Sequence, residues 1–398
     1  MASLFLPCAG GAEALLAEEV LRIAGHAAET TRGGVWVEGD ERLAMALNLE
    51  SRLAQRVLWP LVDGPYRDEH DLYDLGRRVA WTDWITPQQT LRVDVNAVRS
   101  PLRSLNFAAL RIKDAVCDVL RDATGERPSV DTQHPDLPIA LFVGPDHATI
   151  YIDTSGEALF KRGWRENKGE APLKETLAAA MLAAAGWQGR EDDGPLFDPC
   201  CGAGTIAIEA AQMACGIAPG SQRRFAFEKM LPFKPHQAAW RELQAAAKAR
   251  VHAPRVPVFA GDVSFRMTDF ATRNAQLAGV GAAIDFKTAD ALQRLPPAAR
   301  GTMLVNPPYG ERIAAKGQGS DTAGQGFEGG GSSAEFFSGL AGHWKRHYAG
   351  WTGWLLSPDM KLPSLMRLKE SRRVPMWNGP IECRLFRFDM IAGSNKEP

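Results

Sequence analysis

The feature that most constrains the fold is a short apolar stretch that leads directly into a glycine turn and a helical stretch. The residues are 195-PLFDPC-200, continued by 198-DPCCGAGTIAIEAA-211. Glycine lets the backbone approach a ligand closely, and the first turn of a helix presents unpaired N–H groups. In a parallel sheet with helices on both faces, such a turn binds a nucleotide-like cofactor. Alone, the same turn could equally serve only to pack the helix tightly.

The region after the turn alternates between apolar strand-like stretches and helical ones. Short strands separated by helices imply a parallel sheet covered on both faces. Asn378-Gly379-Pro380 is a turn signal near the end, so we expect the last two strands to form an antiparallel hairpin. A long helix over 173–185 comes first, and the predicted strands are 195–198, 256–260, 283–288, 302–306, 351–356, 372–377 and 382–389.

A second motif, 304-LVNPPYGER-312, follows one of these predicted strands. Its two consecutive prolines remove two backbone donors and fix two φ angles, which makes the turn stiff. The Asn306 side-chain oxygen and the Pro307 carbonyl could each accept an N–H of an exocyclic amine, while Tyr309 stacks on the attached ring. Such an amine is a poor nucleophile, so catalysis would consist of positioning and polarisation. A base within a duplex would have to be flipped out to reach the turn.

Together the two motifs resemble those of the S-adenosylmethionine-dependent amino-methyltransferases, usually written DPxCGSGT and (D/N)PP(Y/F). The resemblance implies an α/β fold: a class I (Rossmann-like) methyltransferase domain with a C-terminal antiparallel hairpin, and S-adenosyl-L-methionine as cofactor. It places Asp262 at the ribose hydroxyls and Asp290 at the adenine amine, although each could instead cap a helix. The implied catalytic residues are Asn306, Pro307, Pro308 and Tyr309, and the other implied cofactor contacts are Asp198, Pro199, Cys201, Gly202, Gly204 and Thr205.

The N-terminal part of the chain shows a smaller α+β pattern. We predict a short apolar strand at 4–6, a helix around 14–21, strands at 35–39, 91–98 and 148–154, and a helix near 107–120. Two stretches, 99-RSPLRSLNFAALRIKDAV-116 and 135-PDLPIALFV-143, resemble the RNA-binding THUMP module. The stretch 159-LFKRGWRENKGEAPLKETLAAAML-182 resembles the segment that joins such a module to a methyltransferase.

The resemblance extends over nearly the whole chain to the bacterial 23S rRNA guanine-N2 methyltransferases, and specifically to the N2-methylating half of a larger fused enzyme. It implies a ferredoxin-like region at 1–50, a THUMP domain at 51–155 with an alternative start near 43, and a methyltransferase domain at 156–398. Within the last, the Gly/Ser-rich tract 316–335 cannot bury a core and is expected to be a flexible loop, either an insertion or a lid.

The same resemblance suggests RNA contacts, most plausibly with 23S rRNA or a large-subunit precursor. Charge supports this only locally, because residues 1–150 carry 15 Lys and Arg against 22 Asp and Glu, and the whole chain has a formal charge of -1. Each candidate could instead be an ordinary surface charge, and the aromatic run 225–233 fits a core better than a base-stacking platform. The candidate cations are Arg99, Arg103, Arg111, Lys113, Arg162 and Arg165.

Composition points to a cytoplasmic protein with neither a metal site nor a membrane span. The six cysteines include no CxxC pair and no zinc-like spacing, which suits a reducing compartment. No apolar run approaches the roughly 18–20 residues that a membrane span requires. The alternatives to an rRNA enzyme are a tRNA guanine-N2 methyltransferase, a DNA adenine-N6 methyltransferase and a non-catalytic RNA-binding protein. Absence of cofactor binding would favour the last.

Overall fold

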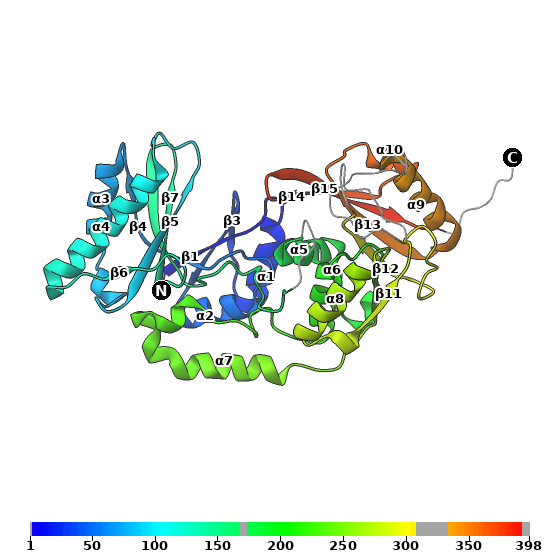
Figure 1. Ribbon diagram of the computed structural model, residues 1–398, viewed down its shortest axis with the longest axis horizontal. Helices are drawn as coiled ribbons and strands as arrows, with labels where there is room; N and C mark the ends of the chain where they lie inside the picture. Colours follow the sequence, from blue (N-terminus) through cyan, green and yellow to red (C-terminus); the bar gives the residue numbers. More distant parts are fainter. Residues whose placement is uncertain (1, 167–172, 308–332, 392–398) are drawn as a thin grey trace. The chain divides into compact units, whose positions relative to one another are not determined.

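The computed structural model describes residues 2–166, 173–307 and 333–391 (Figure 1). Contacts divide the chain into two compact units, each containing one sheet. The first unit comprises Met1–Cys8, Leu16–Leu159 and Gly220–Ala246, and the second comprises Ala9–Leu15, Phe160–Pro219 and Ala247–Pro398. The chain therefore passes between the two units five times. None of the helices in the described residues combines the length and apolarity needed to cross a bilayer.

The first unit is built on an eight-stranded sheet in the order β2-β3-β1-β4-β8-β7-β5-β6. Most strand pairs are antiparallel, but β5 pairs with β6 and β7 in parallel. The strands are β1 (Ala2–Pro7), β2 (Glu29–Thr31), β3 (Gly34–Gly39), β4 (Leu58–Pro65), β5 (Thr90–Ala97), β6 (Ser129–Val130), β7 (Leu137–Val143) and β8 (His147–Asp153). The helices between them are α1 (Glu13–Ala24), α2 (Glu41–Glu50), α3 (Glu69–Arg77), the short η1 (Trp81–Asp83) and α4 (Leu105–Thr124).

Local sequence explains where α4 begins and ends. Its N-cap Ser104 accepts a hydrogen bond from the Phe107 N–H at 3.2 Å, and Gly125 closes it with a left-handed φ of 83°. The strands and helices predicted in this half are all present. The sequence patterns did not predict β2, β4, β6, β7, α2 and α3. Of these, β7 is buried on nearly every residue and so lacks alternation, while β4 contains prolines and a register shift.

The second unit has a seven-stranded sheet in the order β11-β10-β9-β12-β13-β15-β14. The first five strands of this order are parallel, and β15 is antiparallel to both β13 and β14. All seven predicted strands are confirmed to within two residues, including the terminal hairpin. They are β9 (Leu196–Asp198), β10 (Val258–Asp262), β11 (Ile284–Thr288), β12 (Gly301–Val305), β13 (Trp351–Ser357), β14 (Arg372–Asn378) and β15 (Ile381–Asp389).

Helices follow the strands of this second sheet as a doubly wound fold requires. The helix predicted over 173–185 is α5, which packs on α6, while α9 packs on α10. The helices are α5 (Glu175–Ala185), α6 (Thr205–Ala214), α8 (Phe265–Leu277), α9 (Ser333–His347) and α10 (Leu362–Met366). Two short 3₁₀ helices accompany them, η2 (Glu191–Asp193) and η5 (Gly281–Ala283). Of the predicted flexible tract 316–335, residues 316–332 lie outside the described residues, and the last three begin α9.

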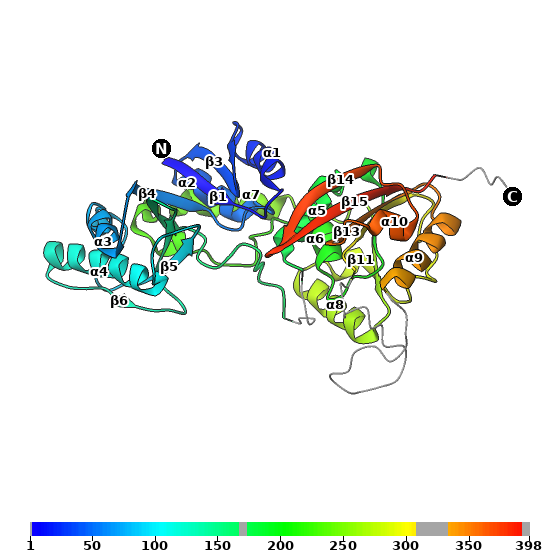
Figure 2. The ribbon, with the colours of Figure 1, turned by 90° about the horizontal axis from the view of Figure 1, so that it is seen from above.

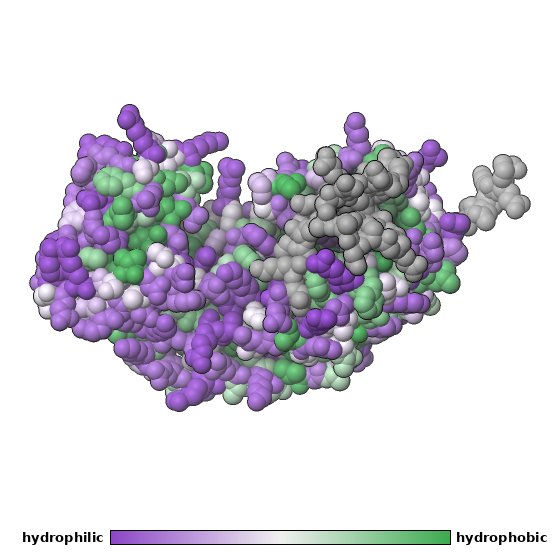
Figure 3. Space-filling view, viewed as in Figure 1, coloured by the Kyte–Doolittle hydropathy of each residue, from purple (hydrophilic) through white to green (hydrophobic). Residues whose placement is uncertain are grey.

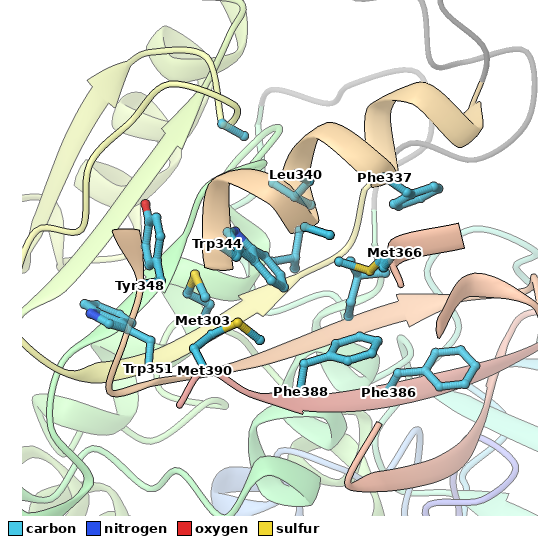
Figure 4. Close-up of a cluster of buried hydrophobic side chains, with 14 of the residues drawn as sticks. Met303, Phe337, Leu340, Trp344, Tyr348, Trp351, Met366, Phe386, Phe388 and Met390 are labelled. Carbon is cyan, nitrogen blue, oxygen red and sulfur yellow. The ribbon is translucent and has the colours of Figure 1, made fainter. Parts of the chain in front are cut away.

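A core of aromatic and methionine side chains holds α9 and α10 against the second sheet (Figure 4). Trp344 of α9 and Tyr348, which directly follows α9, pack in one cluster with Met303 of β12 and Trp351 of β13, and each of these side chains is at most 1% exposed. Full burial of one large apolar side chain stabilises a fold by about 1.5–3 kcal/mol. This cluster therefore fixes the neighbouring strands β12 and β13, whose ends carry part of the site described below.

Residues 220–246 form an aromatic cluster within the first unit. They include the short helices η3 (Ala226–Lys229) and η4 (Leu231–His236) and most of α7 (Gln237–Ala249). The Phe227 and Trp240 rings meet edge to face at 5.0 Å, and Phe225 stacks with Phe227 at 5.4 Å. Phe225, Phe227 and Phe233 are at most 4% exposed, so the run at 225–233 is core.

The segment Ala9–Leu15, a loop that leads into the first turn of α1, packs within the second unit through its glycines. Gly11 has a φ of +82°, and a Cβ atom there would lie 2.2 Å from the Pro375 carbonyl oxygen of β14. At Gly10 a Cβ atom would lie 3.0 Å from the Trp377 ring. Only glycine permits this close approach of the loop to the hairpin.

Candidate functional site

Most of the predicted site residues lie along one edge of the second sheet. Asp198 and Asp262 end the parallel strands β9 and β10, and Asp290 and Asn306 follow β11 and β12. Parallel strands end at the same edge, and their register places Ala260 beside Asp198 and Asp262 beside Thr288. The structure thus brings to one sheet edge four polar residues that are separated by up to about a hundred residues in sequence.

The glycine turn after β9 combines a tight fold with open space. Both glycines adopt left-handed backbone angles, with φ of 52° at Gly202 and 89° at Gly204. At Gly204 a Cβ atom would lie 3.0 Å from the Ala271 Cβ, so this glycine allows α6 to approach α8. At Gly202 a Cβ atom would meet nothing within 4 Å, so the space before this backbone is free for a ligand.

Asp262 connects the glycine turn to the start of α8. One carboxylate oxygen accepts the Gly202 N–H at 3.0 Å, and the other accepts the Ser264 N–H at 2.9 Å. Burial raises the pKa of Asp262, and these two backbone hydrogen bonds oppose the rise. A carboxylate oxygen has two lone pairs, so each can still accept a second hydrogen bond. The cap-like interaction with Ser264 is therefore present and leaves room for a ligand contact.

Asp198 is a buried acid whose charge has little compensation. It is 1% exposed, its carboxylate accepts the Cys200 N–H at 3.2 Å, and it forms no ion pair within the part of the chain that the structure describes. Burial raises its pKa well above the ordinary value, and the nearby charge of Asp262 adds to this effect. Burial also raises the pKa of Cys201 well above the usual range. A cationic ligand group beside Asp198 would offset the unfavourable burial.

Asp290 makes the contacts of a local turn. Its side chain accepts the Leu292 N–H at 2.9 Å, and its carbonyl accepts the N–H groups of Gln293 and Arg294. No local pattern predicted a role for Arg294, which donates to the Ala260 carbonyl at 2.7 Å and stacks 4.7 Å over the Phe197 ring. This arginine supports the ends of β9 and β10 from within the protein.

The predicted catalytic turn is described only at its start. Val305 is fully buried at the end of β12, next to Leu355 of β13, whereas Asn306 is half-buried and Pro307 is buried. Pro308 and Tyr309 lie outside the described residues. The structure therefore places the amide and the first proline at the same edge as Asp198 and Asp262.

Arg162 is enclosed in the second unit, which corrects its prediction as an RNA contact. The side chain is 2% exposed and holds Glu209 of α6 through two hydrogen bonds, at 3.0 and 3.3 Å. Glu209 is itself fully buried. A guanidinium committed to a buried carboxylate has no surface to offer to RNA, and breaking such a pair is strongly destabilising.

Arg165 is likewise internal, and its contacts lead to the glycine turn instead of to solvent. With a side chain 10% exposed, it donates to Glu175 at 2.7 Å, to the Thr205 hydroxyl at 2.7 Å and to the Leu173 carbonyl at 3.2 Å. Burial raises the pKa of Glu175, and the charge of Arg165 opposes that rise. The prediction of an RNA contact is corrected here too, because the guanidinium joins the first turns of α5 and α6.

The four remaining candidate cations lie in the first unit, at and before α4. Arg99 and Arg103 are exposed and form no ion pair with any described residue, whereas Arg111 and Lys113 both pair with Asp114. The Arg111 guanidinium also stacks over the Phe107 ring at 5.1 Å. Figure 3 shows hydrophobic residues on the surface of this unit, and Leu105, Phe107 and Leu110 are 39–45% exposed. Cations and exposed apolar groups therefore occur together here.

Within the described residues, no group of three His, Cys, Asp or Glu side chains is arranged to hold a metal ion. The polar groups at the sheet edge instead suit an organic ligand. They combine carboxylate acceptors, an open glycine backbone and the start of α6, whose first N–H groups can bind an anionic group.

Comparison with known proteins assigns a family model to each region. Residues 162–387 match a model described as an RMKL-like methyltransferase domain (UPF0020), residues 66–153 match the THUMP domain, and residues 3–58 match the RlmL ferredoxin-like domain. Among solved structures, a possible methylase from Clostridium difficile is 27% identical, with a TM-score of 0.84 and coverage of 100% of this chain and 99% of that one. A putative methyltransferase complexed with SAH is 26% identical, with a TM-score of 0.83 and 98% coverage of both chains.

Curated relatives share the name ribosomal RNA large subunit methyltransferase K/L. The protein of Shewanella amazonensis is 37% identical over 404 residues, which cover 100% of this chain and 54% of that protein. The protein of Psychromonas ingrahamii is 37% identical over 393 residues, which cover 97% of this chain and 50% of that protein. The chain thus spans about half the length of the curated relatives it matches.

Proposed function

The chain belongs to the UPF0020 family of RMKL-like methyltransferase domains, and from this premise we propose that it methylates the N2 amine of a guanine in 23S rRNA with S-adenosyl-L-methionine. The observation that carries the proposal is the gathering of Asp198, Asp262 and Asn306 at one edge of a parallel sheet, beside an open glycine turn. The curated relatives that match along the chain carry an rRNA methyltransferase name.

The residues at this edge suit the parts of the proposed cofactor. Asp198 supplies a buried carboxylate for the cationic amino-acid end, and the N–H groups at the start of α6, at Thr205, suit its carboxylate. Asp262 keeps lone pairs for the ribose hydroxyls, and Asp290 is proposed for the adenine amine. When bound, the cofactor supplies an electrophilic methyl group on a sulfonium. Pro199, Cys201, Gly202 and Gly204 complete the turn that lies against it.

For the transfer itself, Asn306 and Pro307 are proposed to hold the amine. The Asn306 side-chain oxygen and the Pro307 carbonyl each accept one N–H, which draws the nitrogen lone pair out of conjugation with the ring. Pro308 stiffens the turn and Tyr309 stacks on the base, both by analogy with the family motif. The N–C bond would form as the S–C bond of the sulfonium breaks and leaves a neutral thioether, and the amine would lose one proton to water, so no strong side-chain base is required.

The first unit is proposed to deliver the RNA. Four cations, Arg99, Arg103, Arg111 and Lys113, are the proposed phosphate contacts, of which the first two have no carboxylate partner among the described residues. We retain the division into regions 1–50, 51–155 and 156–398 as a functional proposal, with the cytoplasm as the compartment.

The experiment is nucleoside mass spectrometry on rRNA, tRNA and DNA from a deletion strain, complemented with the wild-type gene or with Asn306→Ala. We expect N2-methylguanosine to fall in 23S rRNA and to return only with the wild-type gene. A loss confined to tRNA, or a loss of N6-methyladenine from DNA, would replace the proposed substrate. Unchanged nucleosides in all three pools would overturn the proposed methylation.

A further inference from the structure

Six exposed cations of the second unit come from neighbouring elements outside the site described above. They come from the last turn of α9, from the residue before α10, and from the segment between α10 and the start of β14. We call this set the basic band: Lys345, Arg346, Lys361, Arg367, Lys369 and Arg372. We propose that the basic band binds the phosphate backbone of the RNA substrate, an inference that rests on the proposed function.

The charge balance of this part of the chain differs from that of the rest. Residues 333–391 contain nine Lys and Arg against five Asp and Glu, while residues 1–150 contain 15 against 22. Three of the nine cations, Arg373, Arg384 and Arg387, have carboxylate partners. None of the six that form the basic band makes an ion pair with a carboxylate of the described residues, although the charge of Lys369 acts on Glu370, so most of their charge is available to an external anion.

The basic band is held together by contacts between its elements. Lys345 donates to the Arg367 carbonyl at 2.8 Å, which ties the last turn of α9 to the end of α10. The two helices lie side by side in both ribbon views (Figures 1 and 2). Lys369 and Arg372 follow Arg367 within five residues. The end of α9 and the end of α10 are therefore in contact, and the chain itself carries Lys369 and Arg372 on from Arg367.

The backbone of Arg367 gives an independent reason to assign a role to its side chain. It caps α10 in the left-handed conformation, with φ 47° and ψ 39°, where glycine is the usual residue. A side chain held in that conformation is unfavourable for folding, and such outliers mark functional positions. The Arg367 carbonyl accepts a hydrogen bond from Lys345, but the backbone of any residue could do so. The feature that only arginine provides at this position is its guanidinium group.

The basic band begins at the edge of the sheet where the proposed reaction takes place. β13 lies next to β12 in parallel register, so both strands end at the same edge. Asn306 follows β12 and Lys361 lies four residues beyond the end of β13. A polynucleotide whose base reaches Asn306 can therefore extend its backbone along α10. Phosphate contacts of this kind position the substrate without reading its sequence.

The residue composition favours a polyanion over a protein partner. Protein interfaces have an apolar, aromatic-rich centre and are depleted in lysine. Among the described residues from 333 to 391, the large exposed apolar side chains are scattered along the chain, with Met360 at 41%, Ile381 at 49% and Ile391 at 82% exposure. Unpaired lysines and arginines without an apolar centre are what binding to RNA phosphates requires.

The test compares two triple variants in binding to an unmodified in vitro transcript of 23S rRNA between 50 and 200 mM salt. The first carries Lys361→Ala, Lys369→Ala and Arg372→Ala. The matched control carries Arg241→Ala, Lys248→Ala and Arg255→Ala, three exposed cations elsewhere on the chain. Each phosphate contact contributes about 0.7–0.9 to the slope of log Kd against log salt. The first variant removes three such contacts, so we expect its slope to be smaller than that of the wild type by about two. An unchanged slope, or an equal loss in the control, would overturn the proposal.

A single substitution separates a role in RNA binding from a role in folding. Arg367→Gly removes the guanidinium and the unfavourable backbone conformation together. We expect a melting temperature equal to or above that of the wild type, and an RNA Kd about two- to fivefold weaker at 100 mM salt. RNA affinity equal to that of the wild type would contradict the assignment of Arg367. Both measurements are made without methyl transfer, so they remain decisive even if the mass spectrometry assigns another reaction.

Discussion

Replacement of Asp262 by alanine tests the cofactor site most directly. The carboxylate accepts the N–H groups of Gly202 and Ser264 and is proposed to accept the ribose hydroxyls as well. The substitution removes the ligand acceptor and also releases the Gly202 amide of the glycine turn. A hydrogen bond to a charged group contributes about 1.5–3 kcal/mol.

That range corresponds to a loss of affinity for S-adenosylmethionine of about 10- to 150-fold, since each 1.4 kcal/mol is a factor of ten. Asp262→Asn keeps one acceptor oxygen and should lose less affinity than the alanine variant. Isothermal titration calorimetry with cofactor alone measures both losses. Asp269→Ala is the matched control, because Asp269 is also an aspartate of this region, on α8, but is paired with Arg273 at the surface.

The same residue predicts a pH dependence. Burial raises the pKa of Asp262, so its carboxylate gains a proton at a higher pH than an exposed aspartate, whose pKa is about 3.9. A ligand that needs the ionised form binds more weakly as pH falls through this raised pKa. In the absence of cofactor, the folded protein favours the protonated form of Asp262. The contribution of this preference to the free energy of unfolding is lost as pH rises through the same raised pKa. We expect wild-type cofactor affinity to fall as pH decreases through this raised pKa, at a higher pH than an exposed aspartate would give, and Asp262→Asn to flatten that part of the profile.

One result would refute this reasoning. If Asp262→Ala binds the cofactor as tightly as the wild type while its melting temperature falls, Asp262 is only a turn residue that connects Gly202 with Ser264.

Three further predictions concern other residues. Asn306→Ala should lower turnover by about 10²-fold or more, as loss of one oriented polar group does in other enzymes, while cofactor affinity stays nearly unchanged. Single-turnover kinetics measure the rate, and an unaltered rate would contradict the proposed role of Asn306. Arg165→Met should weaken cofactor binding by about 1 kcal/mol, because the Thr205 hydroxyl loses the guanidinium that positions it. Unchanged cofactor affinity in calorimetry would show that Arg165 does not position Thr205 for the cofactor. Gly11→Ala should destabilise the protein more than Gly33→Ala in urea titrations, because both sites have positive φ but only Gly11 faces a backbone oxygen at 2.2 Å; equal losses would contradict the packing argument.

The sequence was most informative where local chemistry and long-range structure agree. The strand ends at Asp198 and Asp262, the glycine turn and the terminal hairpin could be predicted, because short apolar stretches and turn residues mark them directly. The interpretation of Arg162 was wrong for a physical reason. A basic residue in a linker resembles a surface charge in sequence, and nothing local indicates a buried glutamate 47 residues further on.

Supporting contacts were beyond prediction for the same reason. Arg294 acts through a carbonyl on β10 and a ring on β9, which only the register of the sheet brings together. Arg367 departs from the glycine rule for helix ends, so its sequence gives no signal of the left-handed cap. Residues that act through tertiary neighbours are found by structure, and residues that form part of a turn are found by pattern.

The five passages of the chain between the units limit how this protein can be recombined. A hybrid that takes its first unit from a relative must exchange three separate segments, including Gly220–Ala246, which lies in sequence between two segments of the second unit. A single crossover near residue 157 would leave the rings of Phe227 and Trp240 facing a foreign core. Exchange of the first unit by one genetic event is therefore unfavourable, and the two units should be inherited together, as though the protein were one domain.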